Sequence, residues 1–131
     1  MSFEYSMVIP YGDNLESLAT ALKEFPAKKV IALVPSKADG GVVEKLKRFL
    51  LKEGVELELR TVAEEAEDGF FLALAKVKES EANPIVNVSV GTSLYSHVLL
   101  CAAMATGVTA FGVFDGELIF LPISCSISHG K

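Results

Sequence analysis

Hydrophobic residues recur along this chain in two alternating patterns. Short apolar runs rich in β-branched residues predict strands, and longer stretches with an apolar residue at every third or fourth position predict amphipathic helices. The predicted strands are residues 5–10, 30–34, 55–60, 85–88, 108–114 and 117–121. The predicted helices are residues 15–25, 42–53, 64–81 and 93–106. Each of the first four strands is therefore followed by a helix, and the chain then continues with two consecutive strands.

This order of elements predicts one sheet with helices on both faces. Strands that alternate with helices pair in parallel through right-handed crossovers, whereas Asp115-Gly116 is a strong signal for an antiparallel hairpin. Val55–Arg60 alternates strictly between apolar and polar residues, as is typical of an edge strand. We predict a single α/β domain over residues 1–131, with a three-layer, Rossmann-like, mostly parallel six-stranded sheet of order 3-2-1-4-5-6 that ends in an antiparallel β-hairpin.

Composition and charge narrow the classes of protein to which the chain can belong. Of its 131 residues, 50% are hydrophobic and 22% are charged. This balance excludes an intrinsically disordered segment and is enough for a core without disulfides. The formal net charge of −5 argues against direct binding of duplex nucleic acid, because phosphate binding needs a basic face. A small anion held by backbone amides is compatible with this charge.

The sequence contains no targeting signal and no metal-binding spacing. It begins without a basic leader, and no apolar run is long enough to span a bilayer, so we expect a cytoplasmic protein with no membrane partner. Cys101 and Cys125 are too few and too far apart for a disulfide framework or a zinc site, and Cys101 is predicted to lie in the core. The acidic run 64–68 suits a helix start better than a metal site. We expect no metal and no cofactor.

Two loops of the predicted fold have the composition of an anion-binding site. In a sheet of this order, ligands bind at the carboxyl ends of strands 1 and 4, where the strand order reverses. These strands lead into Pro10–Asn14 and Ser89–Ser93, each with one glycine and small polar residues. Such strand–turn–helix junctions direct backbone N–H groups at an anion. The alternative is that Gly91 only permits a tight turn and Thr92 only caps a helix. Neither loop has a dinucleotide or P-loop motif.

The second loop carries a recognisable motif. Asn87-Val88-Ser89-Val90-Gly91-Thr92 resembles the Asn-x-(Ser/Thr)-Gly-Gly-Thr signature of CRISPR-associated Rossmann-fold (CARF) domains, and the whole element order resembles that fold. The resemblance implies a homodimer whose paired loops bind a cyclic oligoadenylate ring, most often cyclic tetra-adenylate, in CRISPR-linked antiviral signalling. By position it implies ligand-binding roles for Tyr11, Gly12, Asp13, Asn14, Ser89, Val90, Gly91, Thr92 and Ser93. Two residues depart from the family pattern: Val90 replaces a glycine, and Ser93 stands where a basic residue is common.

Three hypotheses for function follow. The first is a sensor domain that binds the ring and carries no effector module of its own. The second is a metal-independent ring nuclease, in which Ser89, Thr92 and Ser93 position the ring and Lys37 stabilises charge. Lys37 is the only basic side chain predicted beside the two loops, and its alternative is a solvated loop lysine. The third is a protein-interaction module that uses the fourth helix and the tail 123–127, where apolar residues alternate with serines.

The fourth helix predicts a homodimer under every hypothesis. It is apolar on more faces than one sheet can cover, and an apolar face left in water is typical of an interface. His97, one turn into this helix, is predicted to be buried or to contact the dimer partner rather than to act as a general acid or base.

Overall fold

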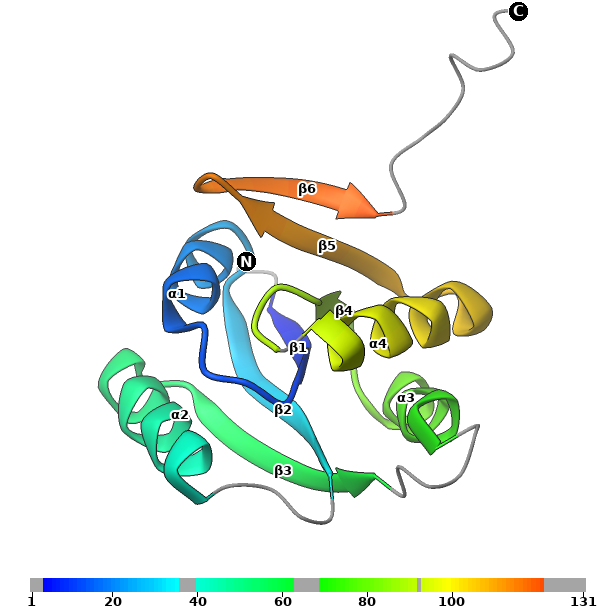
Figure 1. The fold of residues 1–131 in the computed structure, drawn as a ribbon, viewed down its shortest axis with the longest axis horizontal. Coiled ribbons are helices and arrows are strands. Elements are labelled where there is room, and N and C mark those ends of the chain that lie inside the picture. The colour runs from blue at the N-terminus through cyan, green and yellow to red at the C-terminus, as the bar shows by residue number, and fades with distance from the viewer. Residues whose placement is uncertain (1–3, 36–39, 63–68, 92, 122–131) are drawn as a thin grey trace, which may run out of the picture.

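The computed structural model describes residues 4–35, 40–62, 69–91 and 93–121, and Figure 1 shows their fold. The strands are β1 (Tyr5–Pro10), β2 (Ala27–Pro35), β3 (Glu56–Val62), β4 (Pro84–Asn87), β5 (Thr109–Phe114) and β6 (Glu117–Leu121). The helices are α1 (Leu15–Glu24), α2 (Gly40–Glu53), α3 (Gly69–Ser80) and α4 (Ser93–Thr106). The predicted alternation and the final pair of strands are confirmed. The acidic run 64–68 and the tail 123–127 lie outside the described residues.

The sheet has the predicted topology. Its strand order is β3-β2-β1-β4-β5-β6, with parallel pairing from β3 to β5 and an antiparallel β5–β6 hairpin. Helices α1 and α2 cover one face, and α3 and α4 cover the other (Figure 1). At the hairpin turn, Asp115 and Gly116 have φ angles of 52° and 76°. Two consecutive positive φ angles match the twist of the strands, which explains the Asp-Gly pair. The predicted α/β class and strand order are confirmed.

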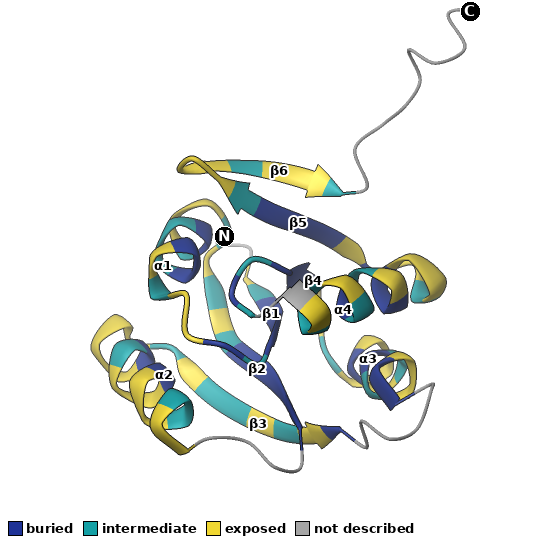
Figure 2. Cartoon of the chain, in the orientation of Figure 1, coloured by how far each residue is buried: buried dark blue, intermediate teal, exposed yellow. Residues whose placement is uncertain are grey.

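The core consists of two layers, one on each face of the sheet. Successive residues of β1 point to opposite faces, so that Val8 packs with α3 and α4 while Met7 and Ile9 pack with α1 and α2. All three are fully buried, and burial of a side chain of this size stabilises a fold by about 1.5–3 kcal/mol. Figure 2 shows the buried residues concentrated in the central strands and on the inner faces of the helices. The carboxyl ends of β1 and β4 therefore lie at the centre of the sheet, between two buried layers of side chains.

Strand β2 is longer at its start than the sequence pattern indicates. It begins at Ala27, whereas the apolar run begins at Val30. Ala27 pairs with Tyr5 of β1, and Lys29 pairs with both Ser6 of β1 and Glu56 of β3. Backbone pairing on either side of Lys28 extends β2 ahead of the apolar run, through residues that the hydrophobic pattern leaves outside the strand.

An ion-pair network joins the strands near their amino ends. Lys29 Nζ lies 3.0 Å from Glu58 Oε1 and 3.3 Å from Glu81 Oε2. Arg60 also pairs with Glu58, and the Ser6 hydroxyl donates to Glu81 Oε1 over 3.1 Å. The hydrogen bond from Arg60, then that from Lys29, lowers the pKa of Glu58, and the hydrogen bond to Glu58 raises the pKa of Lys29. We refer to Lys29, Glu58, Arg60 and Glu81 as the amino-end network.

One face of α4 is left uncovered. Leu99, Ala102 and Ala103 are buried against the sheet and α3, but Leu94 is 67% exposed. The prediction that Cys101 lies in the core is wrong, because Cys101 is exposed. It lies two positions from Leu99, and at about 100° per residue it therefore faces away from the sheet. Within the described part of the chain, no helix is both long and apolar enough to cross a membrane.

Candidate functional site

The two predicted loops touch at the centre of the sheet, where β1 and β4 end. A Cβ atom built on Gly12 would lie 2.3 Å from the Val90 carbonyl oxygen and 2.4 Å from Gly91 Cα. A Cβ atom on Gly91 would lie 2.6 Å from Pro10 Cγ and 2.8 Å from the Tyr11 carbonyl oxygen. Only glycine fits at both positions, because each loop presses its backbone against the other. The expected adjacency of the two loops is therefore confirmed.

Asn14 links the two loops and caps α1. Its backbone N–H donates to the Val90 carbonyl over 3.2 Å, and its side-chain amide donates to the Ser89 carbonyl over 3.1 Å. Asn14 Oδ1 accepts the N–H of Ser17 over 3.2 Å, which satisfies one of the free donors at the helix start. The Asn14 backbone N–H and one of the two N–H donors of its side-chain amide are thus used inside the protein and are not available to an anion.

The second loop is held by β4, β5 and α4. The N–H of Val113 in β5 donates to Ser89 Oγ over 2.6 Å, and the N–H of Ser89 donates to Asn87 Oδ1 over 3.0 Å. The Ser96 hydroxyl in α4 donates to the Val88 carbonyl. Asn87 is fully buried, and its Nδ2 has no hydrogen-bond partner among the described residues. The motif residues Asn87 and Ser89 therefore shape the loop through hydrogen bonds inside the protein.

The other predicted site residues differ in what they present to a ligand. Val90 as a whole residue is 1% exposed and lies in the core, and its carbonyl accepts the Asn14 N–H, so Val90 presents almost no surface to a ligand. Tyr11 is half-buried and packs against the core on the α1 and α2 side. Ser93 begins α4. Lys37 and Thr92 lie outside the described residues.

Lys45 is a basic residue near the site that the sequence pattern did not single out. Its Nζ lies 3.2 Å from Asp13 Oδ2, and both side chains are about half exposed. In the sequence Lys45 is one of several charged residues on the polar side of α2, and nothing local distinguishes it from the others. The structure thus places an ammonium group next to the first loop, although the sequence indicated only Lys37.

A small cavity adjoins the first loop. Its volume is about 210 Å³, and it is lined by Asn14, Glu16, Ser17, Thr20, Val113, Asp115 and Gly116. The carboxylates of Glu16 and Asp115 make this cavity unfavourable for a phosphate, because like charges repel.

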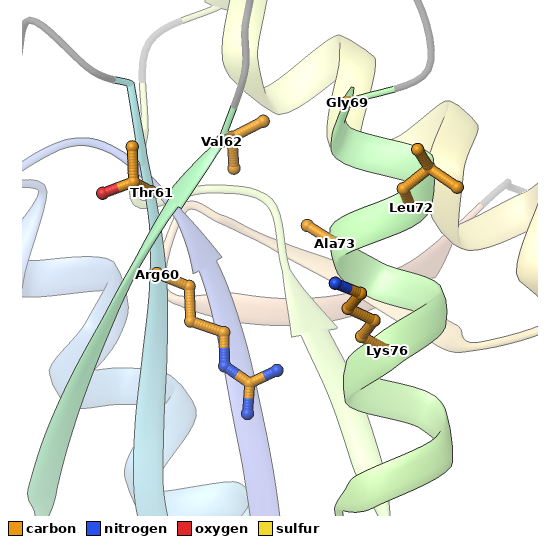
Figure 3. Close-up of a pocket in the computed structure, with 7 residues that line it drawn as sticks. All are labelled: Arg60, Thr61, Val62, Gly69, Leu72, Ala73 and Lys76. Carbon is orange, nitrogen blue, oxygen red and sulfur yellow. The ribbon is translucent and has the colours of Figure 1, made fainter.

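A second cavity lies away from the loops, between β3 and α3 (Figure 3). Its volume is about 330 Å³, and it is lined by Arg60, Thr61, Val62, Gly69, Leu72, Ala73 and Lys76. Arg60 belongs to the amino-end network, so its charge is already paired with Glu58. No residue of either glycine loop lines this cavity, and it is not the predicted site.

No group of three or more His, Cys, Asp and Glu residues is arranged to hold a metal ion in the part of the chain that the structure describes. His97 is exposed on α4, and its ring lies beside Cys101. In this single chain His97 is therefore not buried, which leaves contact with a dimer partner as the predicted role still to be tested.

Comparisons with known proteins were made for the sequence and for the fold. No protein-family model matches the sequence, and no curated protein matches it. Among solved structures, the fold is similar to that of Can2 from Sulfobacillus thermosulfidooxidans in complex with cyclic tetra-adenylate (TM-score 0.69, 18% identity). The two chains share a fold. The alignment covers 88% of this chain and 34% of Can2, so this chain spans about a third of the length of that protein.

Proposed function

We propose that this chain binds a cyclic oligoadenylate, in particular cyclic tetra-adenylate, as a cytoplasmic homodimer that senses the ring in CRISPR-linked antiviral signalling. The observation that carries the proposal is the contact between the Gly12 and Gly91 loops at the strand-order reversal. This is where folds of this type bind nucleotides, and Can2, which has the same fold, was solved with the ring bound.

The second loop is the better candidate for contacting a phosphate of the ring. In the first loop, Asn14 already bonds to the second loop and occupies the Ser17 N–H. The second loop leads directly into α4, a helix of 14 residues, and the amino end of a helix carries a partial positive charge and N–H groups that have no acceptor within the helix. Binding through neutral donors is consistent with a chain whose net charge is −5.

A homodimer suits a cyclic ligand. A ring of identical nucleotides presents the same groups on opposite sides, and a two-fold pair of chains presents the same loops on opposite sides. The uncovered face of α4, with Leu94 67% and Met104 58% exposed, is the surface we propose for the dimer. Because α4 begins at the second loop, parallel pairing of two α4 helices, which is the arrangement we propose, brings two such loops near the two-fold axis.

Titration calorimetry with cyclic tetra-adenylate tests the proposal. We expect saturable heat with one ring bound per two chains, and no heat with linear tetra-adenylate at the same concentration. A double variant Leu94→Glu/Met104→Glu is expected to be monomeric in sedimentation and to lose ring binding. The matched control is Leu51→Glu on α2, which is also exposed (81%) and should change neither result. Absence of both heat and thermal shift at high micromolar ligand would remove the proposal.

The ring-nuclease alternative receives less support from the site. The Ser89 hydroxyl, one of its three positioning groups, is occupied by the N–H of Val113. Mass spectrometry of the ring after incubation with the protein distinguishes the two activities, because a nuclease releases linear products and a sensor returns the intact ring. The interaction-module alternative predicts that the ring neither binds nor is cleaved.

A further inference from the structure

The uncovered face of α4 carries a regular stripe of four residues. Leu94, His97, Cys101 and Met104 follow one another at steps of three, four and three, and all four are exposed. This spacing is that of the a and d positions of a coiled coil, which meet the partner helix. No Asp, Glu, Lys or Arg occurs within 93–106. A second helix can therefore pack against this stripe without burying a charged side chain.

His97 and Cys101, the two central residues of the stripe, place a nitrogen and a sulfur atom almost as close together as two ligands of one metal ion. The distance from His97 Nε2 to Cys101 Sγ is 3.8 Å. Zinc bonds of about 2.0 Å to nitrogen and about 2.3 Å to sulfur at a tetrahedral angle place the two ligand atoms about 3.5 Å apart. A spacing of four residues on a helix is also the one by which two side chains reach a single zinc ion in the His-Glu-x-x-His motif. The two atoms would have to approach by only about 0.3 Å to reach that separation.

One chain supplies only half of such a site. A structural zinc ion takes four ligands, and the described residues contain no group of three His, Cys, Asp or Glu that could hold a metal ion. In the proposed dimer the second loops of both chains lie on the same side, so the two α4 helices run in the same direction. Each residue of the stripe then faces its own equivalent, which brings two imidazoles and two thiols together at the axis.

We propose that His97 and Cys101 of two copies of this chain form one Cys2His2 zinc site at the dimer axis, between layers formed by Leu94 and Met104. The inference rests on the α4 dimer of the proposed function but not on binding of the ring. Each thiol loses its proton to solvent when it binds zinc. The two thiolates balance the charge of Zn²⁺, so the site is neutral, like the surrounding interface.

The test uses the full chain, reduced and freed of metal with a chelator. Titration with Zn²⁺ in competition with a chromophoric chelator should give one zinc ion per two chains. Sedimentation should show that zinc lowers the dimer dissociation constant at least about 10-fold, because the ion binds only the dimer. Co²⁺ in place of Zn²⁺ should give the visible absorption of a tetrahedral ion and a thiolate charge-transfer band.

Matched variants test whether zinc binds to His97 and Cys101 or to the other cysteine and histidine of the chain. Cys101→Ser and His97→Ala should each weaken zinc binding by more than about 100-fold, since losing a direct ligand costs more than losing an outer-shell partner. Cys125→Ser and His129→Ala are the controls, because they remove the chain's other cysteine and other histidine, and they should bind zinc like the wild type.

The outcomes also distinguish this inference from the proposed function. Absence of zinc binding at micromolar concentration, one ion per chain without dimerisation, or loss of binding in Cys125→Ser would each overturn the zinc site. If the metal-free protein binds cyclic tetra-adenylate but no zinc, only the zinc site falls. If it binds one zinc ion per two chains but no ring, the zinc site stands and the sensor proposal falls.

Discussion

The two ends of the sheet are held together by different chemistry. At the carboxyl ends of β1 and β4, the Gly12 and Gly91 loops are joined by backbone contact and by neutral hydrogen bonds from Asn14. At the amino ends, Lys29, Glu58, Arg60 and Glu81 are joined by ion pairs. Apart from the exposed pair of Lys45 with Asp13, the proposed binding end thus depends on the fit of neutral groups, and the opposite end depends on charge.

This difference has a physical consequence. Fit between two backbones leaves no alternative arrangement, so the loops keep their position when pH or salt changes. Ion pairs that are partly exposed contribute less, and their contribution is screened by salt and lost when a partner changes protonation. We therefore expect substitutions at the contact between the two loops to have the larger effects and those in the amino-end network to have the larger dependence on conditions.

The largest effect is expected from Gly12→Ala. The added methyl group would lie 2.3 Å from the Val90 carbonyl oxygen, so the loops must separate. Overpacking of this kind costs about 1–3 kcal/mol in free energy of unfolding, which urea unfolding measures. Gly40→Ala is the control, because a Cβ there meets nothing within 4 Å. Equal stability of the two variants would show that the loops are not held by their contact.

A smaller effect is expected from Asn14→Ala, which removes both the cap of α1 and the bond to the Ser89 carbonyl. Loss of such a cap costs about 0.5–2 kcal/mol. Asn14→Asp keeps the acceptor for the Ser17 N–H but removes the side-chain amide donor. Comparison of the two variants by thermal unfolding therefore separates the cap from the link between loops. If Asn14→Asp is as stable as the wild type, the side-chain link contributes nothing.

At the amino end, Glu58→Gln is expected to cost at most about 1 kcal/mol near pH 7, the upper range for a partly exposed ion pair. Because the pKa of Glu58 is lowered from 4.5, its charge stabilises the fold above that pH, and the stabilisation is lost as pH falls through the folded-state pKa. The difference in unfolding free energy between wild type and Glu58→Gln should therefore shrink in acid. A difference that stays constant in acid would contradict the ion-pair account.

The amino-end network is also expected to lose stabilisation at alkaline pH, where Lys29 loses its charge. The pKa of Lys29 is raised from 10.5, so its contribution is complete below that value and is lost as pH rises through the folded-state pKa. Added salt should weaken the network between these limits, and it should leave the cost of Gly12→Ala unchanged.

The smallest effect is expected from Lys45→Met. The pair of Lys45 with Asp13 is exposed on both sides, so its removal should change the free energy of unfolding by less than about 0.5 kcal/mol. If the ammonium group attracts the ring, calorimetry at low salt should nevertheless show weaker binding in this variant. Lys47→Met is the control, because Lys47 lies on the same helix and, among the residues that the structure describes, forms an ion pair with Glu44 of that helix. Equal ring binding by both variants would exclude a role for Lys45.

Much of the candidate site followed from local sequence. The glycine at the end of each central strand placed the two loops, and the strand order brought them together, as the contacts of Gly12 and Gly91 confirm. The partners of these loops could not be predicted in the same way. Lys45, Val113 and Ser96 reach the loops from elements distant in the sequence, and no local pattern marks them.

The order of elements, the edge position of β3 and the hairpin at Asp115-Gly116 were decided by the chain itself, because periodicity and backbone preference act over a few neighbouring residues. Tertiary packing decided the rest. It extended β2 back to Ala27, because Ala27 pairs with β1 and Lys29 pairs with both β1 and β3, and it turned Cys101 outward beside His97. These outcomes depend on which groups meet across the fold, and that is a property of distances in space rather than of positions along the chain.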